Sequence, residues 1–279
     1  MPELHCGGFR LPLDRPLIMG IVNLTPDSLA GDGMGSDVGR ALRHARNQLD
    51  AGADILDIGA ESSRPGAIPT PEDEELRRLL PVLREIAGWG VPVSVDTYKP
   101  AVMRAALAEG AAMINDISAL GRPDAMAAVA ASDCAVCLMH MQGEPGTMQN
   151  APRYGDVVGE VRGFLAARVA AARAAGIDGR RLVLDPGFGF GKNLQHNLAL
   201  FRALTATGVD DLPMLVGVSR KSMLGAITGR PVGQRLAASI AAATLAALKG
   251  AKILRVHDVA ETRDALAVLA AIDEGVGNE

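Results

Sequence analysis

Ionisable or amide side chains follow short apolar runs at eight places in this sequence, and the stretch Leu182–Lys192 shows the pattern most clearly. Its apolar run ends in a carboxylate, Asp185, and a proline and three alternating glycines follow. Such a run is typical of a strand buried on both faces, so we expect Asp185 where that strand leaves the core. We expect the glycine loop to bring the backbone close to a ligand. The glycine spacing does not fit a Walker nucleotide loop.

The ends of the other seven runs carry the same kinds of group. They are Asn23, Asp57, Asp96, Asn115, His140 after Met139, Lys221, and Arg255 with His257. The carboxylate and amide oxygens of Asp96, Asn115 and Asp185 suit the amino and ring N–H donors of a flat heterocycle. Lys221 offers a donor for a ring carbonyl or nitrogen, and the Arg255 guanidinium can lie flat against one ring face. This set predicts a pocket for a fused bicyclic ring.

A second set of polar residues falls on neighbouring loops and favours an anion. It consists of Asn23, Ser63, Arg64 and His257. A guanidinium such as that of Arg64 pairs well with a phosphate group. Asn23 is the one evident side-chain ligand for magnesium in this set. The predicted cofactor is therefore Mg²⁺ that arrives on a diphosphate and is held largely by phosphate oxygens and water.

These residues need a scaffold in which all eight runs end on one face. After a short hairpin between His5 and Arg15, apolar runs alternate with helical patterns as far as Ile272. The predicted strands are 17–23, 54–59, 91–95, 112–114, 134–139, 182–184, 214–218 and 252–254. The predicted helices are 38–49, 100–109, 123–131, 157–175, 193–206, 232–248 and 259–272. One more helix, after the second strand, is predicted to begin at Pro71 with Thr70 as its cap. Eight such units in about 250 residues predict an α/β fold, a closed (β/α)8 TIM barrel, with a doubly wound open sheet as the alternative.

Composition restricts the class of protein further. The chain has 279 residues and a net charge of −4, and it contains no basic run, so we expect no nucleic-acid partner. The alanine-rich segment 236–248 is too short to span a bilayer and predicts a buried helix, so no membrane partner is expected. Three cysteines in a chain of this length favour a reducing cytoplasm over a disulfide framework. No composition break divides residues 1–279, which predicts a single domain.

Seven motifs in this sequence resemble those of the dihydropteroate synthases, the pterin-binding enzymes of folate biosynthesis, over essentially the whole chain. They are Met19–Ser28, Asp57–Gly66, Ser94–Thr97, Asn115-Asp116, Asp185–Lys192, Ser219–Ser222 and Arg255–His257. The resemblance implies a transferase that joins 6-hydroxymethyl-7,8-dihydropterin diphosphate to 4-aminobenzoate, with diphosphate leaving before the arylamine attacks. It also implies a homodimer.

The resemblance assigns roles residue by residue. Pterin binding would fall to Asp96, Asn115, Met139, Asp185, Lys221 and Arg255, and diphosphate binding to Asn23, Ser63, Arg64, Arg255 and His257, with Asn23 on the metal. The 4-aminobenzoate would meet Ser63, Pro65, Phe190, Ser219 and Lys221. The catalytic residues would be Asp96, Asp185, Lys221 and Arg255, while Cys134, Cys137 and His140 would not act as nucleophiles.

Two departures from the family pattern and two alternatives accompany this assignment. Leu29 and Ala30 stand where the first loop of the family usually has phenylalanine and serine, which bears on the shape of the 4-aminobenzoate site. Ser63 replaces the usual threonine and keeps the hydroxyl. A methyltetrahydrofolate-dependent methyltransferase would have no need of Arg64 and His257. A catalytically silent pterin-binding paralogue is the other alternative, and it rests on the altered first loop alone.

Overall fold

Eight parallel strands form a closed barrel in the computed structural model, which describes residues 2–25, 37–64 and 66–274. They are β3 (Leu17–Asn23), β4 (Ile55–Gly59), β5 (Val93–Asp96), β6 (Met113–Asp116), β7 (Ala135–Met139), β8 (Leu182–Asp185), β9 (Leu215–Val216) and β10 (Ile253–Val256). Hydrogen bonding joins them in the order β8-β7-β6-β5-β4-β3-β10-β9. A parallel bridge between Leu184 and Met214 closes the ring between β8 and β9. The predicted (β/α)8 barrel is confirmed.

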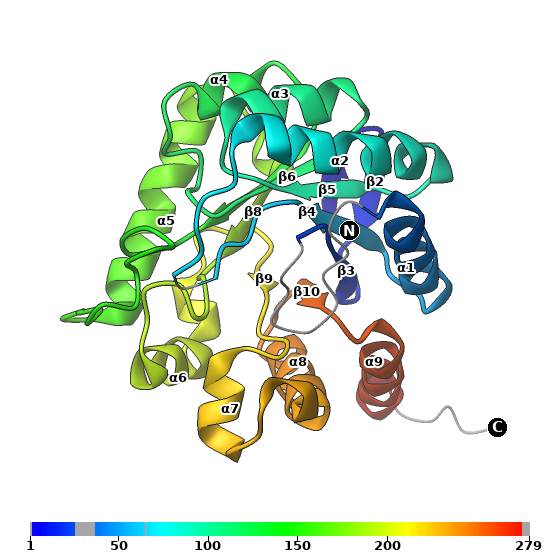
Figure 1. Ribbon diagram of the computed structural model, residues 1–279. Coiled ribbons are helices and arrows are strands. Elements are labelled where there is room, and N and C mark those ends of the chain that lie inside the picture. The colour runs from blue at the N-terminus through cyan, green and yellow to red at the C-terminus, as the bar shows by residue number, and fades with distance from the viewer. Residues whose placement is uncertain (1, 26–36, 65, 275–279) are drawn as a thin grey trace.

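The helices lie outside the strands and surround them (Figure 1). They are α1 (Val38–Asp50), α2 (Glu72–Ile86), α3 (Pro100–Ala108), α4 (Ala125–Ala130), α5 (Val157–Ala174), α6 (Leu194–Arg202), α7 (Ser222–Thr228), α8 (Leu236–Leu248) and α9 (Val259–Glu274). The helices expected from the residue pattern are wrong in two places. They do not include α7, and the helix expected from residue 232 starts at Leu236 after a short 3-10 turn, Val232–Gln234.

The hairpin of β1 (Glu3–Cys6) and β2 (Phe9–Pro12) closes the end of the barrel at which the strands begin. Leu4, Cys6 and Leu13 pack with the inward-facing apolar side chains Met19 and Met113, and all five are buried. The polar residues that end the strands lie at the other end of the barrel, away from the hairpin. Closure by the hairpin leaves the carboxyl ends of the strands as the place for a site.

Some helices begin at a side-chain cap and others do not. Asp37 caps α1, because its side chain accepts a hydrogen bond from the Arg40 N–H at 2.9 Å. The prediction that Thr70 caps the next helix is wrong: Pro71 occupies the N-cap position of α2, and the Thr70 N–H donates to Glu61 instead, at 3.1 Å. Helix α2 therefore starts without a side-chain cap.

Helix α8 is less buried than its composition predicts. Its small residues Ala242 and Ala246 are buried, but the side chains of Leu245 and Leu248 are about half exposed. Among the described residues no helix is long and apolar enough to cross a membrane. The apolar composition of α8 therefore reflects packing on one face and an exposed apolar surface on the other.

Candidate active site

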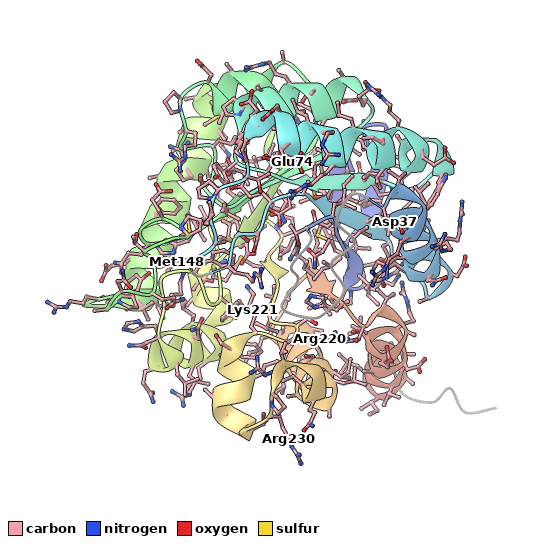
Figure 2. All side chains as sticks on the ribbon, in the orientation of Figure 1. Asp37, Glu74, Met148, Arg220, Lys221 and Arg230 are labelled. Carbon is pink, nitrogen blue, oxygen red and sulfur yellow. The ribbon has the colours of Figure 1, made fainter. Side chains whose placement is uncertain are left out.

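A cavity of about 760 Å³ opens at the carboxyl ends of the strands. All but one of the residues predicted for the site line it, and they are Asn23, Ser63, Arg64, Asp96, Asn115, Met139, Asp185, Phe190, Ser219, Lys221, Arg255 and His257. The exception is Pro65, which lies outside the described residues, as do Leu29 and Ala30. Lys221 lies near the centre of the ring of helices (Figure 2). The fold thus brings together side chains from six strands and the loops that follow them.

The guanidinium of Arg255 bridges two carboxylates on neighbouring strands. Its Nε donates to Asp57 Oδ2 at 2.6 Å and its Nη2 donates to Asp96 Oδ2 at 2.9 Å. Burial raises the pKa of Asp96 to about 7, Arg255 opposes that shift, and Asp57 adds to it. Burial acts to lower the pKa of Arg255, but Asp57 and Asp96 outweigh it, so the guanidinium stays charged. The plane of this side chain is fixed at the floor of the cavity before any ligand arrives.

Sequence reasoning placed Asp57 at a strand end but gave it no part in the site. Asp57 is fully buried and does not line the cavity. Its Oδ2 also accepts from the Asn115 Nδ2 at 3.3 Å. Asp57 therefore acts through its two neighbours, since it holds both Arg255 and the Asn115 amide from below. The position of Asp57 at a strand end is visible in the sequence, but its contacts with Arg255 and Asn115 are not.

Lys221 and Asp185 form the opposite wall. The Lys221 ammonium donates to the Phe188 carbonyl at 2.5 Å and lies 4.7 Å from the centroid of the Phe190 ring. Burial lowers the pKa of Lys221 to about 8, and Asp185 opposes this shift. Burial raises the pKa of Asp185, and Lys221 opposes that shift in turn. The charges of Lys221 and Asp185 thus partly offset the effect of burial on each other's pKa.

Two glycines of the loop after Asp185 approach other backbone, and a third lies where a ligand contact is expected. Gly187 and Gly191 have left-handed φ values of +69° and +60°. An added Cβ would lie 1.9 Å from the His140 carbonyl at Gly187 and 2.3 Å from the Gln142 carbonyl at Gly191. These glycines therefore admit the backbone of the loop after β7 rather than a ligand. Gly189 lines the cavity and is the position that can meet a ligand.

The two aromatic residues of this loop differ in burial. Phe188 is fully buried and its ring packs against Phe201, with centroids 5.6 Å apart. Phe190 is partly exposed and its ring lines the cavity below Lys221. Phe188 therefore anchors the loop in the core, and Phe190 shapes the site.

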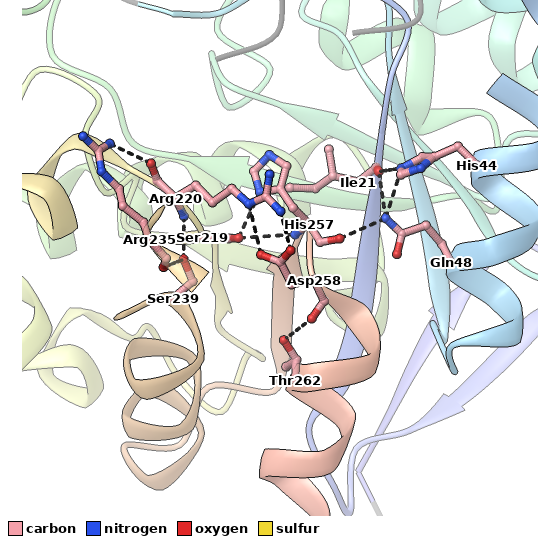
Figure 3. Close-up of polar contacts among 10 residues, drawn as sticks. All are labelled: Ile21, His44, Gln48, Ser219, Arg220, Arg235, Ser239, His257, Asp258 and Thr262. Atoms are coloured by element: carbon pink, nitrogen blue, oxygen red, sulfur yellow. Dashed lines mark hydrogen bonds and ion pairs between the residues drawn. The ribbon is translucent and has the colours of Figure 1, made fainter. Parts of the chain in front are cut away.

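The loops after β9 and β10 are joined by a network of polar contacts (Figure 3). Ser219 Oγ lies 2.9 Å from His257 Nδ1, and Arg220 Nε donates to Asp258 Oδ2 at 3.1 Å. Arg220 has a left-handed φ of +57°, which costs about 1–2 kcal/mol for a residue with a side chain. Its N–H donates to Ser239 Oγ at 2.9 Å, which helps to hold that conformation. Two loops that supply Ser219, Lys221 and His257 are thus fixed to each other.

Helix α1 supports the same network from the side of β3 (Figure 3). The buried Gln48 donates from Nε2 to the Ile21 carbonyl at 3.3 Å and to the His257 carbonyl at 3.1 Å. His44 Nε2 lies 3.1 Å from the same Ile21 carbonyl. Gln48 therefore links the end of β10 to β3, whose last residue is Asn23.

Several residues line the cavity that sequence reasoning did not assign. They include Glu61, Ile117, Met148 and Arg235. Met148 comes from residues 142–154, a loop whose length alone could have drawn attention to it. Its neighbour Gln149 donates to the Gly189 carbonyl at 2.5 Å, which fastens this loop over the glycine loop.

Neither the C-x-x-C pair nor His140 belongs to the cavity lining. Cys134 and Cys137 are buried, and burial raises the pKa of each thiol. Burial lowers the pKa of His140 to about 3, with Lys192 adding to the shift, so the imidazole is neutral. Buried protonated thiols are poor nucleophiles.

The described residues contain no group of three or more His, Cys, Asp or Glu side chains that could hold a metal ion. Asn23 supplies one amide oxygen to the cavity at the end of β3. Hard cations such as Mg²⁺ prefer oxygen ligands and keep several waters when protein supplies only one or two. A cation beside Asn23 would need most of its ligands from a bound anion and water.

Comparison with known proteins gives concordant matches. A family model described as pterin binding enzyme matches residues 19–257. A dihydropteroate synthase of Neisseria meningitidis serogroup B is 51% identical over 275 residues, which cover 96% of each chain. The crystal structure of a Burkholderia cenocepacia dihydropteroate synthase complexed with 7,8-dihydropteroate is 51% identical, with a TM-score of 0.90 over 98% of this chain and 96% of that one. A Xanthomonas albilineans dihydropteroate synthase with 4-aminobenzoic acid is 51% identical, with a TM-score of 0.91 over 98% of this chain and 99% of that one.

Proposed function

We propose that the cavity of this chain joins 6-hydroxymethyl-7,8-dihydropterin diphosphate to 4-aminobenzoate. The chain belongs to the pterin-binding enzyme family, and it is a transferase with the activity of a dihydropteroate synthase. The products are 7,8-dihydropteroate and diphosphate. One observation carries the proposal: Asp96, Asn115, Asp185, Lys221 and Arg255 converge in a single cavity. Their donors and acceptors match the edge of a pterin ring.

The pterin lies on the floor of this cavity. Asp96, Asn115 and Asp185 accept from its amino and ring N–H groups, and Lys221 donates to a ring acceptor. The Arg255 guanidinium, which Asp57 and Asp96 hold in place, stacks on one ring face, and Met139 lines the same pocket. A buried set of this kind rejects ligands that leave its polar groups unpaired.

The diphosphate lies towards the loops after β3, β4 and β10. Asn23, Ser63, Arg64, Arg255 and His257 bind it, and all five line the cavity. We also propose that Mg²⁺ accompanies it, because Asn23 offers the single hard oxygen ligand that such an ion needs from the protein. When bound, the ion supplies charge stabilisation to the leaving group. Arg64 and His257 have no evident purpose in a methyltransferase, which disfavours that alternative.

In the proposed reaction, diphosphate departs before the arylamine attacks. The C–O bond to the methylene breaks, its electron pair leaves with diphosphate, and the dihydropterin ring delocalises the positive charge. Asp96 and Asp185 stabilise this cation through the field of their carboxylates. The nitrogen of 4-aminobenzoate then donates its electron pair to the methylene carbon and releases one proton. No covalent bond to the enzyme is needed.

The second substrate binds above the first. We place 4-aminobenzoate among Ser63, Pro65, Phe190, Ser219 and Lys221. Its ring packs on Phe190, and its carboxylate meets Ser219 and the backbone N–H groups at the start of α7, where the helix dipole favours an anion.

The test follows both products together. Purified protein is given the dihydropterin diphosphate, Mg²⁺ and 4-aminobenzoate, and diphosphate and dihydropteroate are measured over time. Wild type should form both in equal amounts, and Asp96→Asn should form them at least about a hundredfold more slowly. Asp178→Asn, a change at an exposed ion pair, is the control and should behave as wild type. Pterin binding without either product would refute the proposal and support the silent paralogue.

We further propose a cytoplasmic homodimer in which residues 1–279 act as one domain. All three thiols are free and buried, as suits a reducing compartment. Leu245 and Leu248 on α8 and Val268 and Ile272 on α9 are exposed apolar side chains, and these two helices pack against each other. A shared apolar face of this kind is typical of a subunit interface. Light scattering should give twice the chain mass, and Leu248→Glu should shift the protein towards the monomer.

A further inference from the structure

Three charged side chains form a buried cluster under the loop between β4 and α2, residues 60–71. The Lys99 ammonium donates to Glu61 Oε2, to Glu75 Oε2 at 2.6 Å and to the Thr70 carbonyl at 2.5 Å. Glu75 is 1% exposed, and the side chains of Glu61 and Lys99 are mostly buried. We call Glu61, Lys99 and Glu75 the loop clamp.

The loop clamp forms hydrogen bonds at both ends of the loop. Glu61 stands at its beginning, and its Oε1 accepts from the Thr70 N–H at 3.1 Å and from the Tyr98 hydroxyl at 2.9 Å. Thr70 stands at the end of the same loop and gives its carbonyl to Lys99. One ammonium and one carboxylate therefore close a loop of some ten residues, which reduces its conformational freedom.

Burial of the three charges in the loop clamp has a free-energy cost. Burial raises the pKa of Glu75, and the hydrogen bond from Lys99 opposes the shift. Burial acts to lower the pKa of Lys99, but Glu61 and Glu75 raise it by more. Glu75 Oε1 is buried without a hydrogen-bond partner among the described residues. Apolar side chains often stabilise a buried site as well as an ion pair does, so stability alone does not account for this cluster.

The residues held by the loop clamp belong to two substrate regions. Ser62, Ser63 and Arg64 follow Glu61 directly and line the cavity. Ser62 Oγ accepts from the Arg64 Nε at 2.9 Å, so the start of the loop and Arg64 are linked. On the other side, Lys99 comes three residues after Asp96, at the N-cap of α3. The loop clamp thus joins the loop of Arg64 to the strand end of Asp96.

We propose that Glu61, Lys99 and Glu75 are positioning residues that set Ser63 and Arg64 at a fixed distance from Asp96. This inference rests on the proposed function and adds a determinant of how the diphosphate and the 4-aminobenzoate are held. Lys99 and Glu75 do not line the cavity, so they act only through the loop. Loss of the loop clamp weakens the handling of diphosphate and 4-aminobenzoate and leaves the pterin contacts of Asn115, Asp185 and Lys221 in place.

Lys99→Met is the main test, with Lys99→Arg as the conservative variant. Lys99→Met should raise the KM for 4-aminobenzoate about tenfold or more, since small misplacements of binding groups have effects of this size. Its Kd for 6-hydroxymethylpterin, which lacks the diphosphate, should stay near that of wild type. Lys99→Arg should recover part of the loss, because a guanidinium can bridge two carboxylates. The control is Arg84→Met, which removes an exposed ion pair between the same two helices, Arg84–Glu109 at 2.6 Å, and should change neither constant.

Further readouts separate this inference from the proposed function. Inorganic diphosphate with Mg²⁺ should raise the Tm of wild type, and the rise should be much smaller in Lys99→Met, whether or not the protein turns over. If Lys99→Met does not fold, Glu75→Gln serves in its place and should show the same pattern to a smaller degree. Equal losses of pterin and 4-aminobenzoate binding would overturn the inference, as would a lower Tm with an unchanged KM. An inactive wild type that keeps the diphosphate effect would overturn only the proposed function.

Discussion

Lys192 is buried among acceptors, and its replacement by methionine should destabilise the protein strongly. The ammonium lies 2.9 Å from His140 Nδ1, 2.9 Å from the Gly187 carbonyl and 2.9 Å from the Phe190 carbonyl. Burial lowers the pKa of Lys192 to about 7, and Asp185 opposes this shift. Lys192 is 2% exposed, so water cannot easily replace the donor. This one side chain fastens the glycine loop to the loop after β7.

The expected loss follows from counting the acceptors that would lack a donor. The Gly187 carbonyl keeps a bond from the Phe190 N–H at 3.1 Å. The Phe190 carbonyl, His140 Nδ1 and the His140 carbonyl, which accepts from Lys192 at 3.3 Å, lose theirs. Each buried acceptor without a partner costs about 1–3 kcal/mol, so Lys192→Met should lower the free energy of unfolding by about 3–9 kcal/mol. For a chain of this size, that is a fall in Tm of roughly 6–36 °C. Lys221 should also lose position, because it donates to the Phe188 carbonyl of the same loop.

Urea unfolding followed by circular dichroism measures the first effect, and titration with 6-hydroxymethylpterin measures the second. Lys249→Met is the matched control: its ammonium donates to one exposed carbonyl, that of Arg202 at 3.2 Å, so the change should stay within about 0.5 kcal/mol. A Lys192→Met protein within about 1 kcal/mol of wild type would refute the reasoning, because the acceptors would then have found water or other donors.

Three further predictions concern titration, packing and thiol chemistry. kcat/KM should fall as the pH drops through about 7, because Asp96 must be ionised to stabilise the pterin cation and burial raises its pKa to that value. Asp57→Asn should move this acid limb to lower pH, since the charge of Asp57 raises the pKa of Asp96; an unmoved limb would contradict the assignment. Phe188→Ala should cost about 3–5 kcal/mol of stability, as measured by unfolding. Phe190→Ala should mainly raise the KM for 4-aminobenzoate, as measured by kinetics. The reverse result for the two variants would show that their roles are misassigned. The three buried cysteines should react with a thiol reagent only on unfolding, so rapid labelling of native protein would count against their burial.

The sequence by itself determined the architecture and the chemical types at the site. Apolar runs that end in residues such as Asn23, Asp96 and Asp185 alternate with helical patterns, and eight such units favour a closed barrel whose parallel strands finish on the same face. Local patterns also placed most helices, and they failed where the determinant was not local. Helix α7 is short and lacks a side-chain cap, and α2 begins at Glu72 after Pro71, also without a side-chain cap.

Only the tertiary structure decided which side chains act together. Arg255 pairs with Asp57 across 198 residues, Lys192 meets His140 across 52, and Lys99 joins Glu61 across 38. Periodicity tells which face of a strand is buried, but it carries no information on the neighbours across the barrel. Those neighbours depend on strand register and on loop paths, and a buried charge takes whichever partner that geometry brings within hydrogen-bonding distance. For this reason the residues that would touch the substrates could be proposed from the sequence, whereas Asp57, Lys192 and the loop clamp could not.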